Sequence, residues 1–411
     1  MTRNWAGTHD YAAAHIISTS TEAEVRRVLA ATTGPVHALG TRHSFTDLPD
    51  TTGTLLDLSG LSGDFSLSAG AVRVAAGTRY GVLASWLDEQ GLALHNLGSL
   101  PHISVAGATA TGTHGSGDGN GVLTTAVRSI RFITFDGDVR EVRRGEPEFA
   151  ALAVGVGAFG VVVSLELETQ ANYRMRQDIY TGVSWGAALD ALDDLTGAGY
   201  SVSVFTRWLG KSIGAVWVKT RLATDGDPVA GALLDGVLDA EAAPLGELAD
   251  VTEIGGVPGP WMLRLPHFRL DGTPSFGDEI QSEYFVARED AAAALAAVRE
   301  LGPLIEPLLF VSELRTMSAD ELWLSPAFGR DSLAIHFTWR NEPRAVHEVL
   351  PKIEAALAPF GARPHWGKLH GLTRADVERV HPRLADARAV FQRYDPEERF
   401  VNDHLVRVGV R

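Results

Sequence analysis

A run of small and hydroxyl-bearing residues, NLGSLPHISVAGATATGTHGSG at positions 96–117, constrains the fold of this chain more than any other feature. Such side chains cannot fill a hydrophobic core. They suit a loop whose backbone N–H groups approach an extended anion such as a pyrophosphate. A second loop of this kind, LGTRHSF at 39–45, follows the predicted strand VHALG. One such loop alone would indicate a tight turn with a structural histidine, but two of them predict a dinucleotide site.

Three other segments resemble known functional motifs in sequence but lack the structural context or a residue that each motif requires. GVGAFG (155–160) resembles a dinucleotide fingerprint, but a helix-like segment precedes it and the strand VVVSLELE follows it, which reverses the Rossmann order. We therefore interpret these glycines as close-packing or turn positions. GKSIG (210–214) joins two strand-like runs, so a hairpin loop is favoured over a nucleophile elbow. HEVLP (347–351) lacks the second histidine of a zinc-protease helix, and we predict no metal site.

Charge and cysteine content exclude whole classes of function. Lys and Arg number 36 against 51 Asp and Glu, a net charge of −15, so nucleic acid and anionic membranes are poor partners. The absence of cysteine excludes disulfides, thiolate metal sites and a cysteine nucleophile, so redox chemistry would need a bound cofactor. The N-terminal segment lacks the apolar run of a signal peptide, and the apolar stretch 149–163 is shorter than the roughly 20 residues of a membrane helix. We expect a cytoplasmic protein without a membrane partner.

The 411 residues predict two α+β domains with largely antiparallel sheets, one at 1–175 and one at 176–411. The boundary is placed where polar-alternating strands begin, near residues 170–180. The segment SIRFITFDGDVREVR (129–143) predicts a hairpin with a type I′ turn at AspGly 136–137. The C-terminal end is predicted to be a loop-rich tail. Periodicity predicts helices at 21–32, 80–91, 287–302 and 345–361 and strands at 201–208, 212–221, 308–317 and 332–340.

Six segments together resemble the bacterial alditol (xylitol) oxidases: GTRHSF, SLPHISVAGATATGTHGSG, SELRTM, LWLSPAFGRDS, HFTW and RPHWGK. This family is a branch of the vanillyl-alcohol-oxidase-type flavoproteins, with an FAD-binding domain of the p-cresol methylhydroxylase (PCMH) type. The likeness implies that 1–175 is an FAD-binding domain of two α+β subdomains. It also implies that 176–411 is a substrate domain, an antiparallel sheet with flanking helices, whose C-terminal tail returns to the flavin domain. One departure is Arg42, where relatives usually have glycine.

The resemblance implies a covalently bound FAD. The imidazole of His43 would be bonded to the 8α-methyl carbon of the flavin, which requires a neutral imidazole as the nucleophile. The other implied cofactor contacts are Gly40, Thr41, Arg42, Ser44, Ser99, Ser104, Gly107, Thr111, Gly112, Thr113, His114, Val162 and His365.

Glu313 and Arg315 are two positions apart in a predicted strand, so both side chains point to the same face. An exposed charge pair is the ordinary explanation of such a pattern. The resemblance instead places both in a polyol pocket with Ser99, Thr338 and Lys368. A polyol offers only hydroxyl groups, so the pocket must supply both hydrogen-bond acceptors and donors.

The resemblance also implies the chemistry. A terminal CH2OH would lose a hydride to flavin N5 and a proton from its hydroxyl. The predicted catalytic residues are Lys368, which would assist proton loss if nearby Arg315 lowers its pKa, and Arg315, which would stabilise the anionic reduced flavin.

Gly98 precedes Ser99 in the loop expected to face the flavin, and its missing β-carbon would leave room for O2. This oxygen gate favours an oxidase that releases H2O2; the alternative is a turn glycine with positive φ. Two other functions stay open, an aldonolactone oxidase of the gulonolactone type and a sugar-binding flavoprotein without turnover. SLPHISVAG and HFTW favour the alditol branch, and the intact His43, Arg315 and Lys368 favour an enzyme. The expected partners are a small polyol and O2, and we expect a monomer.

Overall fold

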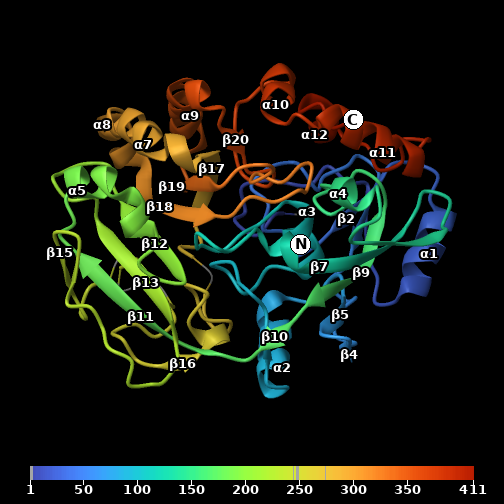
Figure 1. Cartoon of the computed structure of the whole chain (residues 1–411). Coiled ribbons are helices and arrows are strands. Elements are labelled where there is room, and N and C mark those ends of the chain that lie inside the picture. The colour runs from blue at the N-terminus through green and yellow to red at the C-terminus, as the bar shows by residue number, and fades with distance from the viewer. Residues whose placement is uncertain (1–2, 244, 247–249, 274) are drawn as a thin grey trace.

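The chain is organised around β-sheets with helices packed on them. The structure is a computed structural model that describes residues 3–411 with the exceptions of 244, 247–249 and 274. Figure 1 shows the sheets of the first part of the chain on the right, and a larger sheet formed by the second part on the left. This arrangement is the predicted α+β fold, because most strand pairs are antiparallel and the helices are segregated from them.

A small parallel sheet near the N-terminus is the exception to the antiparallel pattern. Its strands are β1 (His15–Ser18), β3 (Thr54–Asp57) and β2 (Val36–Leu39), in this order. Parallel strands need a crossover connection, and α1 (Glu22–Ala31) carries the chain from β1 to β2 on the other side of β3. The predicted helix at 21–32 is confirmed, with Thr21 as its N-cap.

The second sheet of this region is antiparallel and five-stranded. Its order is β4 (Ser66–Ser68), β5 (Ala71–Ala75), β9 (Val161–Glu168), β7 (Val127–Ile133) and β8 (Val139–Arg143). The predicted hairpin is β7–β8, but the type I′ turn is wrong, because the strands are joined by five residues, 134–138, in which only Gly137 has positive φ. The carboxylate of Asp136 instead accepts from Thr134 Oγ1 and from Asp138 N, which stabilises a longer loop.

Short elements connect these sheets and bring the small-residue loop against them. The predicted helix at 80–91 is α2, and Gly91 follows it with φ 70°, the left-handed conformation that glycine favours. The elements are α2 (Tyr80–Glu89), β6 (Leu92–Ala93), α3 (Val105–Ala110), α4 (Phe149–Leu152) and β10 (Gln170–Ala171), which pairs with β6.

After β10 the chain enters a ten-stranded sheet, and this change of sheet is where we propose that the first domain ends. The order across the sheet is β14 (Ala232–Leu233), β15 (Gly236–Leu238), β11 (Arg174–Thr181), β13 (Ala215–Leu222), β12 (Ser201–Thr206), β18 (Leu309–Met317), β19 (Ser332–Arg340), β17 (Glu279–Ala287) and β20 (Arg363–Pro364), with β16 (Gly259–Pro260) beside β11.

The central strands of this sheet have one apolar and one polar face. Side chains alternate along a strand, so Ile335 and Phe337 point one way and His336 and Thr338 the other. The apolar face packs against helices and forms a buried cluster with them. These helices are α5 (Trp185–Asp190), α6 (Leu192–Thr196), α7 (Ala291–Arg299), α8 (Gly302–Ile305) and α9 (Pro343–Leu357). The polar face is therefore turned toward the first domain.

The C-terminal segment forms helices, so the expectation of a loop-rich tail is wrong. It contains α10 (Arg374–Val380), α11 (Leu384–Tyr394) and α12 (Asp403–Arg407). The buried residues Leu384, Ala387, Val390 and Phe391 recur at helical spacing along α11. Arg393 forms an ion pair with Glu148, and an Arg399 guanidinium nitrogen donates to the carbonyl of Leu29, so this segment packs on the first domain.

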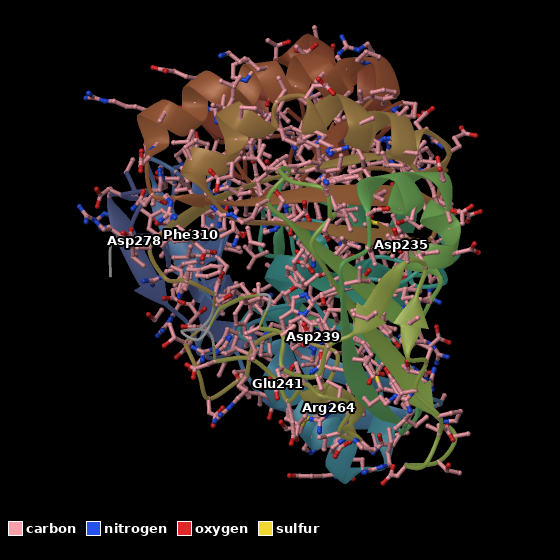
Figure 2. The ribbon with its side chains drawn as sticks, turned by 90° about the vertical axis from the view of Figure 1, so that its left-hand side faces the viewer. Asp235, Asp239, Glu241, Arg264, Asp278 and Phe310 are labelled. Atoms are coloured by element: carbon pink, nitrogen blue, oxygen red, sulfur yellow. The ribbon has the colours of Figure 1, made fainter. Side chains whose placement is uncertain are left out.

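The long connection between β15 and β17 lies along one side of the large sheet. Figure 2 shows Asp235, Asp239 and Glu241 along this side, with Arg264 below them. Asp235 and Glu241 are exposed, as expected for a chain with an excess of acidic residues. In the described part of the chain, no helix combines the length and apolar character needed to cross a membrane.

Candidate active site

A large cavity lies between the loops of the first domain and the polar face of the ten-stranded sheet. Its empty space, including the opening to solvent, is about 1860 Å³. Most of the predicted site residues line it: Gly40, Thr41, Arg42, His43, Ser44, Gly98, Ser99, Ser104, Gly107, Thr111, Thr113, His114, Val162, Glu313, Arg315, Thr338, His365 and Lys368. Gly112 is not part of this lining. It has φ 64°, and a β-carbon there would lie 2.8 Å from Pro326 Cδ, so it serves the turn.

The two small-residue loops are in direct contact. Thr41 Oγ1 accepts a hydrogen bond of 3.2 Å from the backbone N–H of Ser104. A β-carbon at Gly40 would lie 2.6 Å from Ser104 Oγ, and one at Gly107 would lie 2.8 Å from the same oxygen. Glycine at both positions therefore leaves room for the Ser104 hydroxyl in its present orientation, which a side chain at either position would displace.

Arg42 adopts a backbone conformation that favours glycine. Its φ is 66°, a region that costs a non-glycine residue about 1 kcal/mol or more. The guanidinium forms a 2.6 Å ion pair with Asp57, and the Arg42 carbonyl accepts from Trp5 N at 2.8 Å. These contacts hold the strained conformation and so preserve the geometry of the loop beside His43.

His43 has the properties of a neutral nucleophile. Burial is the main cause that lowers its pKa to about 4, and the charges of His102 and Arg79 lower it further. Its Nδ1 lies 3.1 Å from Thr41 Oγ1, whereas Nε2 is buried without a hydrogen-bond partner in the described part of the chain. The ring stacks on Trp5, with centroids 5.2 Å apart and planes inclined by 17°.

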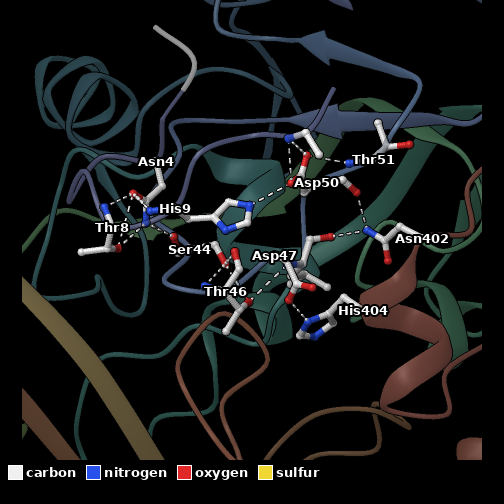
Figure 3. A network of polar contacts seen from close by, with 12 residues as sticks. Asn4, Thr8, His9, Ser44, Thr46, Asp47, Asp50, Thr51, Asn402 and His404 are labelled. Carbon is white, nitrogen blue, oxygen red and sulfur yellow. Dashed lines mark hydrogen bonds and ion pairs between the residues drawn. The ribbon is translucent and has the colours of Figure 1, made fainter. Parts of the chain in front are cut away.

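Both ends of the chain hold the segment that follows His43 (Figure 3). From the N-terminal side, Asn4 donates to the carbonyl of Ser44 at 3.1 Å, and His9 Nε2 lies 2.8 Å from Asp50. From the C-terminal side, the Asn402 amide donates to the carbonyl of Asp50 at 2.7 Å, and His404 Nδ1 lies 2.8 Å from Asp47. The His43 loop is thus fixed by contacts that only the folded chain can make.

The glycine segment 155–160 has a second role besides the close packing that we predicted. A helix, α4, precedes it and the strand β9 follows it, so the exclusion of a Rossmann unit is confirmed. A β-carbon at Gly157 would lie 2.5 Å from His37 Cε1. Gly155, Gly157 and Gly160 also line the cavity, which the sequence reasoning missed.

These features fit an FAD molecule. The glycine positions let the backbone approach an extended ligand, and the loops at 40–45 and 104–114 together with 155–160 surround one end of the cavity. The buried Nε2 atoms of His43 and His37 lack partners within the described residues, so a ligand can satisfy them. No group of three His, Cys, Asp or Glu side chains suited to a metal ion occurs among the described residues.

Strand register aligns the polar side chains at the other end of the cavity. Glu313 pairs with His336 across β18 and β19, and His336 pairs with Glu283 across β19 and β17. Gln281 and Thr338 form the next such pair. All five are buried, so the explanation of Glu313 and Arg315 as an exposed charge pair is wrong; their exposed fractions are 5% and 6%.

Glu283 connects the predicted catalytic residues, and the sequence reasoning missed it. Its Oε1 accepts from Arg315 Nη2 at 2.8 Å and its Oε2 from Lys368 Nζ at 2.8 Å. Burial alone would raise the pKa of this carboxyl, but the charges of Lys368 and Arg315 hold it well below its usual value. The alternation in EIQSEYFVA (279–287), with Gln281 and Glu283 on one face, was the signal available in the sequence.

The surroundings of Lys368 lower its pKa, and those of Arg315 connect it to the first domain. The pKa of Lys368 is lowered, as predicted, but burial is the main cause and Arg315 only adds to it, while Glu283 opposes the shift. Arg315 Nη1 donates to Ser99 Oγ at 3.1 Å, so the predicted residues of the first and second domains meet.

Gly98 is not a turn glycine with positive φ, so that alternative is wrong. A β-carbon at this position would meet Ile103 Cδ1 at 3.5 Å and the carbonyl of His114 at 3.7 Å, which are ordinary contact distances. A small side chain therefore fits here without strain, but it would occupy part of the cavity wall beside Ser99.

Known proteins match both the first and the last part of the chain. The family model described as "FAD binding domain" matches residues 13–143, and the one described as "D-arabinono-1,4-lactone oxidase" matches residues 278–408. An alditol oxidase from Streptomyces sp. (strain IKD472 / FERM P-14339) is 40% identical over 98% of this chain and 97% of that protein. The chain belongs to the alditol oxidase family. This family is a branch of the vanillyl-alcohol-oxidase/PCMH-type flavoproteins, as the sequence motifs predicted.

Proteins of lower identity also match this alditol oxidase family member. An L-gulono-1,4-lactone dehydrogenase from Mycobacterium tuberculosis is 28% identical over 98% of both chains. The cholesterol oxidase of B. sterolicum shares the fold with a TM-score of 0.78 at 14% identity, covering 99% of this chain and 96% of its own. A xylooligosaccharide oxidase from Myceliophthora thermophila C1 shares the fold with a TM-score of 0.76 at 17% identity, covering 98% of this chain and 93% of its own.

The structure predicts unequal roles for two buried glutamates on β17. Glu283→Gln would remove the carboxylate that both cations contact, leaving Lys368 without its counter-charge and Arg315, among the described residues, with only Glu313 at 3.6 Å, and should lower the free energy of unfolding by about 3–5 kcal/mol. Glu279 is the matched control, because it faces the same side of the strand, its pKa is raised by burial, and it accepts from Ser275 and Gln281 rather than from a cation. Glu279→Gln should cost about 1–2 kcal/mol. Urea unfolding of both variants measures the difference, and equal losses would contradict this assignment.

Proposed function

We propose that this protein oxidises the terminal CH2OH of an acyclic polyol, such as xylitol or sorbitol, to the aldose, with O2 reduced to H2O2. The observation that carries the proposal is the set of donors and acceptors that line the cavity, Ser99, Glu313, Arg315, Thr338 and Lys368, of which Glu313, Arg315 and Thr338 are buried. Such a wall matches a substrate that offers only hydroxyl groups. The name of the relative that is 40% identical over nearly the whole chain supports the same substrate class.

The cofactor of this proposal is FAD, held by the loops at 40–45 and 104–114. When bound, FAD accepts two electrons from the alcohol carbon and passes them to O2. We propose that His43 forms the covalent link, since its imidazole is neutral near pH 7 and its Nε2 has no other partner among the described residues. The stacking of His43 on Trp5 would orient the ring for that bond.

The residues at the other end of the cavity would orient the polyol and hold its proton. Ser99 Oγ accepts from Arg315, so its own O–H is free to donate to a substrate oxygen. Burial lowers the pKa of Lys368, which increases the fraction of neutral amine able to take the hydroxyl proton at Nζ. The nearby Glu283 carboxylate would stabilise Lys368 once it carries that proton.

An aldonolactone oxidase is the second candidate. The match of residues 278–408 to the D-arabinono-1,4-lactone oxidase model is the observation that favours it. A sugar-binding flavoprotein without turnover is a more remote alternative. Peroxide release over a panel of polyols and aldonolactones distinguishes all three, because the proposal requires a higher kcat/KM for polyols.

The catalytic roles of Arg315 and Lys368 are tested by anaerobic reduction of the bound flavin with xylitol. Arg315→Ala and Lys368→Ala should each lower the reduction rate constant by about 10²–10³, because each removes a contact to the reacting groups. Lys352→Ala is the control, since Lys352 is exposed on α9. A reduction rate equal to wild type in either catalytic variant would remove that residue from the proposal.

The covalent link makes its own prediction. The flavin should stay with the wild-type polypeptide after acid denaturation, so that the band fluoresces in a gel, whereas His43→Ala should release all of its flavin or bind none. Thr41→Val is a useful comparison because it removes the Nδ1 contact and keeps the imidazole. A wild-type flavin that appears entirely in the supernatant would disprove the link.

We propose that Gly98 leaves space for O2. Gly98→Val should slow reoxidation of the reduced flavin while leaving anaerobic reduction by polyol largely unchanged. Gly98→Ala should have a smaller effect on the same step, because its β-carbon fits at ordinary contact distances. The two half-reactions are measured separately by stopped-flow absorbance. Equal slowing of both, or unchanged reoxidation in the valine variant, would argue against an oxygen gate.

A further inference from the structure

Lys219, on β13, is a buried lysine that the proposed reaction does not use. Its side chain has 0% exposure, and no ion pair of Lys219 occurs among the described residues. Its Nζ donates to the carbonyls of Leu265 at 2.5 Å and Pro266 at 3.4 Å and lies 2.9 Å from His267 Nδ1. Burial lowers the pKa of Lys219 well below its usual value, although the charge of Glu313 opposes this shift, and Nζ has N–H groups to donate to these acceptors in either protonation state.

His267 connects this lysine to the polyol wall of the cavity. Its Nε2 lies 2.6 Å from Glu313 Oε1, and its ring stacks on Trp217 with centroids 4.9 Å apart and planes inclined by 16°. Burial first, and Lys219 second, lower the pKa of His267 to about 4, so the ring is neutral near pH 7. A neutral ring that accepts from Lys219 at Nδ1 must carry its proton on Nε2, and it donates this proton to Glu313.

These contacts fix the Glu313 carboxylate and use only one of its two oxygens as a hydrogen-bond acceptor. Although burial opposes ionisation, the charge of Arg315 and the contact with His267 hold its pKa well below the usual value. Oε1 receives the His267 hydrogen bond and lies 3.6 Å from Arg315 Nε. Oε2 meets no donor from the described part of the chain, and Glu313 lines the cavity, so this oxygen is available to a substrate hydroxyl.

We propose that Lys219 and His267 are positioning residues that present Glu313 to the hydroxyl groups beyond the reacting end of the substrate, and so select polyols over simple alcohols. This inference rests on the proposed polyol oxidation. A methionine would fill the volume of Lys219 without the cost of burying an amine, so packing alone does not explain a lysine here. A lysine is needed here because it donates a hydrogen bond to His267 Nδ1.

The test compares substrates of equal chain length, xylitol and 1,2-pentanediol, in steady-state assays. Lys219→Met should raise KM for xylitol roughly ten- to hundredfold, with a smaller change in kcat, because the charge-assisted contact between Glu313 and a substrate hydroxyl is lost. It should change kcat/KM for 1,2-pentanediol less than about threefold. Combined with Glu313→Gln, Lys219→Met should add almost nothing, because both changes act through the same carboxylate.

A matched set of variants distinguishes positioning from general damage. His267→Gln keeps an N–H toward Glu313 and should retain most of the xylitol affinity, whereas His267→Phe keeps the stacking on Trp217 and should lose it. Thr252→Val is the packing control, because among the described residues Thr252 Oγ1 donates only to the backbone carbonyls of Pro266 at 2.7 Å and His267 at 3.4 Å, and no hydrogen bond joins it to the side chains of Lys219, His267 or Glu313. Thr252→Val should therefore keep the wild-type KM for xylitol.

Several outcomes would overturn the inference. Equal losses for xylitol and 1,2-pentanediol, or additive effects of Lys219→Met and Glu313→Gln, would show that Lys219 acts on stability alone. If Lys219→Met does not fold, equal xylitol KM values in His267→Gln and His267→Phe decide against the proposal. A wild-type protein that oxidises no polyol would instead refute the proposed function, so the two failures are distinguishable.

Discussion

The Glu283 carboxylate between Arg315 and Lys368 is the interaction on which the site depends. Two cationic side chains line the same cavity, Arg315 buried and Lys368 largely so, and a charge in a medium of low dielectric is costly without a counter-charge. Each oxygen of Glu283 serves one of them, so β17, β18 and the turn that carries Lys368 must keep their mutual positions. The charge balance thereby links the packing of the substrate domain to the chemistry proposed for it.

The two faces of the large sheet have different roles: one packs in the hydrophobic core and the other lines the proposed site. One face packs aromatic and aliphatic side chains such as Phe337 and Trp339 against α7 and α9. The opposite face carries Glu313, His336 and Glu283 side by side, because consecutive strands place residues of matching register next to each other. Slippage of a strand by one residue would exchange the faces and bury charges in the apolar cluster, so the hydrophobic packing fixes the register of the polar face.

The cofactor end of the cavity is organised differently, by close approach of backbone segments. Gly40 and Gly107 leave no room for a β-carbon beside Ser104, and both ends of the chain hold the segment after His43 through Asn4 and Asn402. The C-terminal segment supports this end from outside the cavity, through contacts of Asn402 and His404 with residues 47–50. A ligand bound there would contact surfaces that are distant in the chain and adjacent only after folding.

The sequence by itself determined the fold class, the two small-residue loops, the Glu-x-Arg strand and the exclusion of a Rossmann unit, because these follow from local composition and from side-chain period. The assignment of His43 came from the family resemblance and stays a proposal. Only the tertiary structure decided the roles of Glu283, His267 and Lys219, since the partner of a buried charge depends on strand order and on loops that no local pattern encodes. The helical C-terminal segment and the five-residue β7–β8 loop were also missed. Helix α11 gains its stability by packing on the first domain, and the loop by hydrogen bonds of Asp136 that compete with a two-residue turn.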